Sequence, residues 1–178
     1  PSLTQLRAAT RQSAMVSVAA GGKALVVASI RSLTNVCISV EPGNRVTPHC
    51  SAQGRIVLAF SDEQTQAQML GQEMQRFTTS TICTPQAVQE RLETVRRRLW
   101  DVAEGEMAVG ISALAAPVFR DDGIIAGTIG IVGTSVAIPA DPPPALVAAV
   151  QEVAAAMSER LNNHSYAQLA APRKRKPG

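Results

Sequence analysis

The sequence predicts a mixed α/β (α+β) domain in which antiparallel hairpins alternate with amphipathic helices. Two pairs of strand-like segments are joined by glycine-containing turns, one at Gly21-Gly22 and one at 120–123. Glycine supplies the positive φ angles that tight hairpin turns require. Two further segments, after Thr84-Pro85 and after Asp141-Pro142, carry apolar residues at helical spacing behind a capping residue and a proline. With 178 residues, the chain is long enough to form one domain around its own core.

The N-terminal part is predicted to form a helix and then three strands. Leu3 and Leu6 indicate a short helix within 2–13, and the polar residues that follow end its apolar pattern. The hairpin pairs a strand at 13–18 with one at 24–29, and the segment NVCISV at 35–40 is expected to be a third strand, closed by the turn residues EPGN.

The middle and end of the chain are predicted to be helical. One helix is expected at 51–60, and Ser61 is expected to cap a second helix through Leu70, so that the two form an angled pair. The later helices are recognised by their spaced apolar residues, which are Val88, Leu92, Val95 and Leu99 in the first and Leu146, Val150, Val153, Met157 and Leu161 in the second.

The hairpin at 110–133 contains an unusual series of glycines, Gly127, Gly130 and Gly133, in its second arm. Each glycine weakens a strand, so something must approach this backbone closely. Strict alternation places Ile125, Gly127, Ile129 and Ile131 on one face, and Ala126, Thr128, Gly130 and Val132 on the other. The first arm adds Ser112 and Ala116, or Ala113 and Ala115, to the second face, depending on its register. This face of small groups is filled either by a helix, by a partner subunit or by a small molecule.

Charge and cysteine content exclude several classes of protein. The four basic residues at 173–176 account for the positive charge, because removing them takes the formal charge from +3 to −1. A broad nucleic-acid surface on the folded body is therefore not expected. We expect a domain at 1–165 and a basic, disordered tail at 166–178, with a nucleic-acid-binding arm as the alternative for the tail. Three widely spaced cysteines, no secretory signal pattern and no long uninterrupted apolar run predict a reduced, cytoplasmic protein without a membrane span.

Several longer segments carry a family resemblance. The segment TPHCSAQGRIVLAF and the segment from RFTTSTICTP through GISALAAPVFRDDGIIAGTIGIVGTSV are similar to the effector-binding domain of the IclR family of bacterial transcriptional regulators. The residues that fit the family pattern in order are His49, Gly54, Arg76, Phe77, Thr78, Thr81, Ile82, Glu104, Glu106, Gly110, Ala115, Ala116, Pro117, Val118 and Phe119. The resemblance covers about residues 2–161.

The resemblance implies a GAF-like domain with a curved, mainly antiparallel sheet flanked by helices. It implies a small organic effector, often a carboxylate, no enzymatic activity and no cofactor. It also implies homodimers or homotetramers that hold winged helix-turn-helix domains on operator DNA. That DNA-binding domain is not in this sequence, so we expect a fragment of a longer regulator.

Carried over by position, the resemblance predicts the effector site. The predicted ligand-binding residues are Asn35, Ile38, Ser51, Ala52, Gln53, Gly54, Ala103, Ala113, Gly130 and Val132. The free N–H groups of a helix that begins at 51–54 suit an anion. Where some relatives have an acid, a cysteine and two serines, this chain has alanine, glycine and valine, so we expect a larger or more apolar acid.

Other readings of these residues remain open at this stage. The domain can be an assembly module with a vestigial pocket, or a small hydrolase that uses Cys50 or Ser51. Asp101, Glu104 and Glu106 can form a solvated loop, in which Glu106 pairs with an arginine, or contact the effector. Two cysteines and His49 do not complete a zinc site, so no metal is expected, and Cys37 is expected to be a small buried residue of a strand.

Overall fold

A computed structural model describes residues 1–35 and 37–170. The helices are α1 (Ser2–Thr10), α2 (Ala52–Ala59), α3 (Glu63–Leu70), α4 (Pro85–Arg98) and α5 (Pro144–Arg160), with short 3-10 helices η1 (Asp121–Gly123) and η2 (Tyr166–Ala170). The strands are β1 (Ser13–Ala20), β2 (Lys23–Ile30), β3 (Arg45–Val46), β4 (Asp101–Glu104), β5 (Ile111–Arg120) and β6 (Ile124–Thr134). Among these described residues, no helix is long and apolar enough to cross a membrane.

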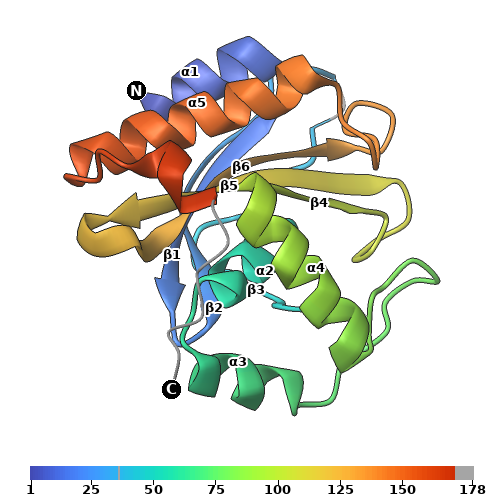
Figure 1. Ribbon diagram of the computed structural model, residues 1–178. Coiled ribbons are helices and arrows are strands. Elements are labelled where there is room, and N and C mark those ends of the chain that lie inside the picture. The colour runs from blue at the N-terminus through green and yellow to red at the C-terminus, as the bar shows by residue number, and fades with distance from the viewer. Residues whose placement is uncertain (36, 171–178) are drawn as a thin grey trace.

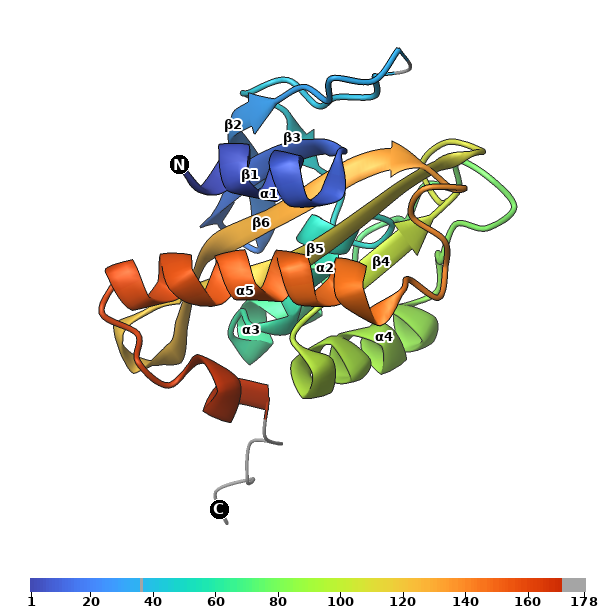
Figure 2. The same cartoon turned by 90° about the horizontal axis from the view of Figure 1, so that it is seen from above.

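One curled sheet separates two layers of helices. Its strand order is β3-β2-β1-β6-β5-β4, and every described pairing is antiparallel. Helices α1 and α5 cover one face, and α2 and α4 cover the other, with α3 beyond α2 (Figures 1 and 2). The mixed α/β fold with a curved antiparallel sheet is thus confirmed.

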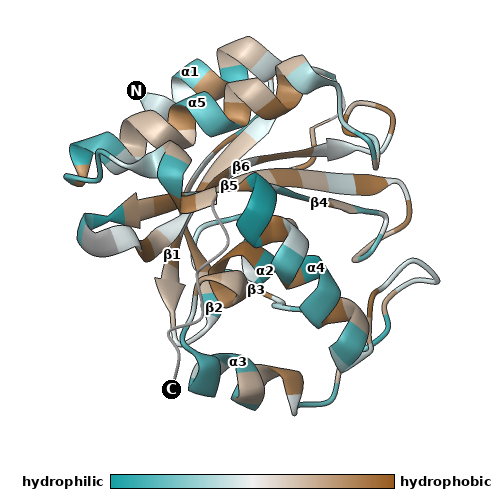
Figure 3. Cartoon of the chain, viewed as in Figure 1, coloured by the Kyte–Doolittle hydropathy of each residue, from teal (hydrophilic) through white to brown (hydrophobic). Residues whose placement is uncertain are grey.

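Each face of the sheet has its own hydrophobic core. Leu6, Leu114, Ile131 and Val150 belong to the core beneath α1 and α5. Ile56, Leu58, Val88, Leu92 and Val95 belong to the core beneath α2 and α4. Figure 3 shows hydrophobic residues in the central strands and hydrophilic residues gathered on α3 and α4. The central strands β5 and β6 are therefore buried on both sides over most of their length.

Turn and cap residues explain most of the element boundaries. Gly21 and Gly22 have φ angles of 56° and 74°, as the predicted tight turn between β1 and β2 requires. The Thr84 hydroxyl accepts a hydrogen bond from the Ala87 N–H, and Pro85 is the first residue of α4. The predicted hairpin, α4 start and terminal helix are confirmed.

Three predicted boundaries are wrong. The described residues within 35–40 form no strand, and β3 follows the EPGN turn instead. Ser61 does not cap α3, because its hydroxyl donates to the Val57 carbonyl of α2, and Asp62 is the cap. Asp141 does not cap α5, because Pro142 and Pro143 each precede another proline and therefore avoid helical backbone angles, so that the helix starts only at Pro144.

The faces of β6 differ from strict alternation at one point. The β5–β6 register shifts so that Val118 is opposite Gly127, whereas Phe119 is opposite Ile125. This bulge changes the phase of the strand. Ile125 therefore packs against the α2 core, whereas Ile129 and Ile131 pack beneath α1 and α5.

The chain remains packed beyond residue 165. The Tyr166 ring lies 5.8 Å from the Phe119 ring, and the Leu169 side chain lies against Gly123. Residues 166–170, which the sequence assigned to the tail, thus form η2 on the domain. The basic run at 173–176 lies outside the described residues.

Candidate functional site

The N-terminus of α2 is held by a short, closely packed loop. The Ser51 hydroxyl donates to the Thr47 carbonyl at 2.6 Å and accepts from the Gly54 N–H at 3.1 Å. A Cβ at Gly54 would lie 2.5 Å from the Thr47 carbonyl oxygen, so only glycine fits there. Among the described residues, the N–H groups of Ala52 and Gln53 have no hydrogen-bond partner. These buried donors remain available at the positive end of the helix dipole.

Small residues of three adjacent strands form a floor on the α2 side of the sheet. Ala103 of β4, Ala113 of β5 and Val132 of β6 are opposite one another in register. Ala115 and Gly130 make the next cross-strand pair. The register therefore selects Ala113 and Ala115 for this face, and Ala52 of α2 packs in the same core as Ala103 and Ala115.

Ile38 covers part of this floor. It packs against a cluster of Met15, Val26 and Val132, and Ala113 borders both this cluster and the α2 core. Asn35, in contrast, is exposed. The structure thus brings together nine of the ten predicted residues around the start of α2 and the adjacent sheet, and leaves Asn35 outside. Whether these residues bind a ligand remains a prediction.

The glycines of β6 are explained by close contacts inside the protein. A Cβ at Gly127 would collide with the Ser17 carbonyl of β1, and one at Gly133 would collide with the Gln12 side chain. A Cβ at Gly130 would lie 2.6 Å from the Leu114 carbonyl oxygen. Packing of strands and side chains, rather than of a helix or a ligand, therefore requires these glycines.

Three buried polar residues beside the floor were not recognised as a group from the sequence. Ser17 of β1 lies opposite Thr128 of β6, and its hydroxyl donates to the Gln53 side-chain oxygen at 3.0 Å. Gln53 Nε2 and Thr128 Oγ1 are buried and have no hydrogen-bond partner among the described residues. The sequence did contain one signal for this group. Alternation places the polar Thr128 on the same face of the strand as Gly130, which was predicted to face the ligand.

Arg55 of α2 is fully buried in an ionic network. Its guanidinium lies 2.6 Å from an Asp101 oxygen and 2.7 Å from a Glu106 oxygen, and it also donates to the backbone carbonyls of His49 and Val102. Burial alone would lower the pKa of Arg55, but the two carboxylates outweigh burial and raise it. Arg55 therefore ties the start of α2 to β4 and the loop after it.

The acidic residues are not a solvated loop. Asp101 is buried and also pairs with Arg91 and Arg98, each at 2.8 Å. The Glu106 backbone carbonyl accepts from the Thr81 hydroxyl at 2.7 Å. The expected pairing of Glu106 with an arginine is confirmed, but Asp101 and Glu106 are both structural residues of the interior.

The environments of Cys50 and Cys37 do not match the roles considered for them, a nucleophile for Cys50 and a buried strand residue for Cys37. Cys50 is buried, and burial raises the pKa of its thiol to about 11. Cys37 is exposed and lies outside any strand. Within the described part of the chain, no three His, Cys, Asp or Glu side chains come together as a metal site.

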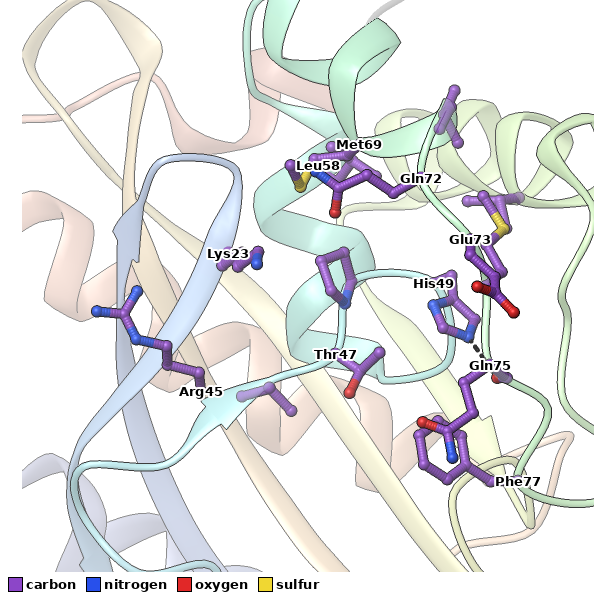
Figure 4. Close-up of a pocket in the computed structure, with 15 residues that line it drawn as sticks. Lys23, Arg45, Thr47, His49, Leu58, Met69, Gln72, Glu73, Gln75 and Phe77 are labelled. Atoms are coloured by element: carbon purple, nitrogen blue, oxygen red, sulfur yellow. Dashed lines mark hydrogen bonds between the residues drawn. The ribbon is translucent and has the colours of Figure 1, made fainter.

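Two surface hollows lie away from the predicted effector residues. One, of about 270 Å³, runs between β3, α3 and the segment 72–77, and Lys23 and Arg45 lie across it from Glu73 (Figure 4). At its edge, His49 Nε2 is 2.9 Å from the Gln75 carbonyl oxygen, and its ring faces Phe77. The other, of about 400 Å³, lies between the two hairpin turns and the end of α2.

Comparison with known proteins identifies the family. The family described as bacterial transcriptional regulator IclR, C-terminal, matches residues 1–159. RhmR of Escherichia coli K12, an HTH-type transcriptional regulator, is 27% identical over 139 residues, which are 78% of this chain and 54% of RhmR. KdgR of Dickeya chrysanthemi is 24% identical over 165 residues, covering 92% of this chain and 54% of KdgR. The chain thus spans about half the length of these relatives.

Solved structures agree with this match. An IclR transcriptional regulator from Alicyclobacillus acidocaldarius has a TM-score of 0.81 and 26% identity, over 90% of this chain and 65% of that one. An IclR homolog from Microbacterium hydrocarbonoxydans, complexed with 4-hydroxybenzoate, has a TM-score of 0.81 and 18% identity, over 91% and 65%. The curated relatives are transcriptional regulators and repressors rather than enzymes. This chain belongs to the IclR family of bacterial transcriptional regulators and matches its C-terminal domain.

Proposed function

We propose that this domain senses a small organic carboxylate and thereby modulates DNA binding by a longer regulator. The DNA-binding part would be a winged helix-turn-helix domain, and the full regulator would act as a homodimer or homotetramer. Effector binding changes the subunit arrangement only if the effector binds one arrangement more tightly than the other.

The observation that carries the proposal is the start of α2. Buried Ala52 and Gln53 offer N–H groups without partners at the positive end of a helix. The side chains of the adjacent floor, Ala103, Ala113 and Ala115, are small and fill little of the space above the sheet. Ala113 is partly exposed although it lies in the middle of the sheet. A carboxylate would accept from the two N–H groups, and the body of the ligand would lie on the floor. The 4-hydroxybenzoate in the Microbacterium homolog supports an aromatic acid as the first candidate.

Thermal shift and calorimetry with matched ligands test this proposal. At a hundred times its Kd, a ligand adds about 2.7 kcal/mol of stability, and each kcal/mol raises the Tm by about 2–4 °C for a protein of this size. Benzoate, 4-hydroxybenzoate and aliphatic acids should raise the Tm, whereas their amides should not. Equal shifts with acids and amides would show that no anion site exists.

A variant that fills the space above the floor with a larger side chain tests whether the ligand binds there. Ala113→Leu should abolish the shift by occupying the space beside Ala113, whereas Ala148→Leu on exposed α5 should leave it unchanged. Gly130→Leu is unsuitable, because the added Cβ would disrupt the β5–β6 pairing whether or not a ligand binds there. If Ala113→Leu bound the acids with unchanged affinity, the floor would not be part of the ligand-binding site.

An assembly module without an effector is the second candidate. Leu33, Val109 and Val136 are 83%, 85% and 94% exposed, and all three lie in loops at the same end of the sheet. The Ser135 N–H donates to the Gly110 carbonyl at 2.9 Å, so the loops of Val109 and Val136 are in contact. Sedimentation analysis of Val109→Asp/Val136→Asp should show monomers if this surface joins subunits, and unchanged oligomers would exclude it.

A further inference from the structure

A group of three buried polar residues, Ser17, Gln53 and Thr128, lies between α2 and the sheet. They are 1%, 2% and 0% exposed. Ser17 and Thr128 face each other across the β1–β6 pairing, and Gln53 is the second residue of α2. The group therefore adjoins both the free N–H groups of α2 and the floor at Gly130, which lies two residues after Thr128 on the same face.

The group has too few hydrogen bonds for its burial. The Ser17 hydroxyl donates to one end of the Gln53 amide at 3.0 Å and fixes its orientation. The other end of that amide and the Thr128 hydroxyl have no partner among the described residues. Folded proteins pair nearly all buried polar atoms, so an amide end and a hydroxyl that both lack a partner and both adjoin Ser17 indicate a partner that enters from outside.

The chemistry of the open groups selects that partner. No charged side chain is hydrogen-bonded to the group among the described residues, and nearby Arg55 is fully occupied by Asp101 and Glu106. A second carboxylate would therefore be buried without a counter-charge, at a high desolvation cost. A hydroxyl, in contrast, accepts from the amide and donates to Thr128 without burying charge.

We infer that Ser17, Gln53 and Thr128 form a subsite that recognises a hydroxyl group of the effector. This inference rests on the proposed function, because the carboxylate of the same molecule would lie at the α2 N-terminus. The effector is then a hydroxylated carboxylic acid. The sequence had favoured a more apolar ligand, because Ala103, Ala113, Gly130 and Val132 carry no polar groups. The polar contacts come instead from β1, from α2 and from one residue of β6.

Matched pairs of acids test the subsite. Calorimetry would compare 4-hydroxybenzoate with benzoate, 3-hydroxybenzoate with benzoate, and 3-hydroxybutyrate with butyrate. In the wild-type domain, at least one hydroxylated member should bind about tenfold or more tightly than its deoxy partner, because a site built for a hydroxyl is left unpaired without it. Thr128→Val keeps the shape of the side chain and should remove that preference while leaving the affinity for the deoxy acid unchanged.

Controls separate the subsite from general effects. Thr79→Val, on an exposed loop, should keep the full preference. Thr128→Val should melt at or above the wild-type temperature, because it removes a buried hydroxyl that has no partner. A crystal structure of the complex should show the ligand hydroxyl between Gln53 and Thr128.

The outcomes distinguish this inference from the proposed function. Acids that bind without any preference for the hydroxylated member, or a preference that persists in Thr128→Val, would overturn the subsite and leave the carboxylate sensor standing. A water molecule found between Gln53 and Thr128 in the ligand complex, in place of the ligand hydroxyl, would also overturn it. Failure of every acid to bind would overturn both.

Discussion

At the scale of single residues, Arg55 has the most unexpected environment. It lies in the run GRIVLAF, at a position that helical spacing alone does not mark as buried, yet it is fully enclosed. Its partners Asp101 and Glu106 are 46 and 51 residues away in sequence. Such long-range pairing leaves no local pattern, so the sequence indicated only that Glu106 would find an arginine.

Arg55→Met should destabilise the domain strongly. The substitution removes the charge that compensates buried Glu106 and part of the compensation of Asp101. Breaking a buried ion pair from one side costs about 3–5 kcal/mol, which urea unfolding would measure. Arg97→Met, at an exposed position of α4, should change stability by less than about 0.5 kcal/mol. Adding Glu106→Gln to Arg55→Met should recover part of the loss, and no recovery would indicate that packing rather than charge dominates.

The cysteines should differ in reactivity and in its pH dependence. Hydrogen bonds from Ser13 and Ser32 lower the pKa of the exposed Cys37 thiol, whereas burial raises that of Cys50 to about 11. The thiolate is the reactive form, so Cys37 should be alkylated first at pH 7–8, and Cys50 should stay unmodified until the pH approaches its raised value or the domain unfolds. Peptide mass spectrometry after timed iodoacetamide labelling checks the order. Rapid labelling of Cys50 at neutral pH would instead support the alternative hypothesis of a hydrolase that uses Cys50 as its nucleophile.

At the scale of elements, the sequence predicted what local chemistry determines. Turns and caps of this kind depend only on adjacent residues, through their φ angles and capping hydrogen bonds. They determine the element boundaries at Gly21-Gly22, at Thr84-Pro85 and at 120–123. The sequence did not show which of two neighbouring candidate residues would take a given role. Ser61 and Asp62 are both good caps, and only the packed structure shows that Ser61 is engaged by α2. The segment at 35–40 has strand-like composition, but β2 pairs with Arg45 and Val46 instead.

The end of α1 offers a stabilising substitution. Arg11 has a φ of 60°, in the left-handed region that glycine adopts without steric cost, and its N–H bonds the Arg7 carbonyl as a C-cap. Its side chain is exposed. Arg11→Gly should therefore stabilise the domain by about 0.5–1 kcal/mol relative to Arg11→Ala, since alanine keeps the Cβ clash. Denaturant midpoints of the two variants provide the comparison, and an alanine variant as stable as the glycine variant would show that α1 frays at this end.

At the scale of the whole molecule, the sheet divides two cores and also joins them to the candidate site. The resemblance predicted this architecture and nine residues that do lie around the start of α2. It could not reveal the group of Ser17, Gln53 and Thr128, because that group depends on the register between β1 and β6 and on the position of α2 above both strands. Sites assembled from three separate elements follow from the fold rather than from any one motif.

The limit of the folded domain is the last property of the whole molecule that can be tested. The sequence placed this limit at residue 165, but Tyr166 packs against Phe119, which itself contacts Phe60 in an edge-on arrangement. Deleting residues 166–178 should therefore expose this aromatic cluster and cost about 1–3 kcal/mol, the usual value for losing one buried large side chain. Deleting only 171–178 retains Tyr166 and Leu169 and serves as the reference. Equal unfolding midpoints for the two truncated proteins would show that η2 adds nothing to stability and that the domain ends at 165, whereas a lower midpoint for the longer deletion would extend the folded domain through η2.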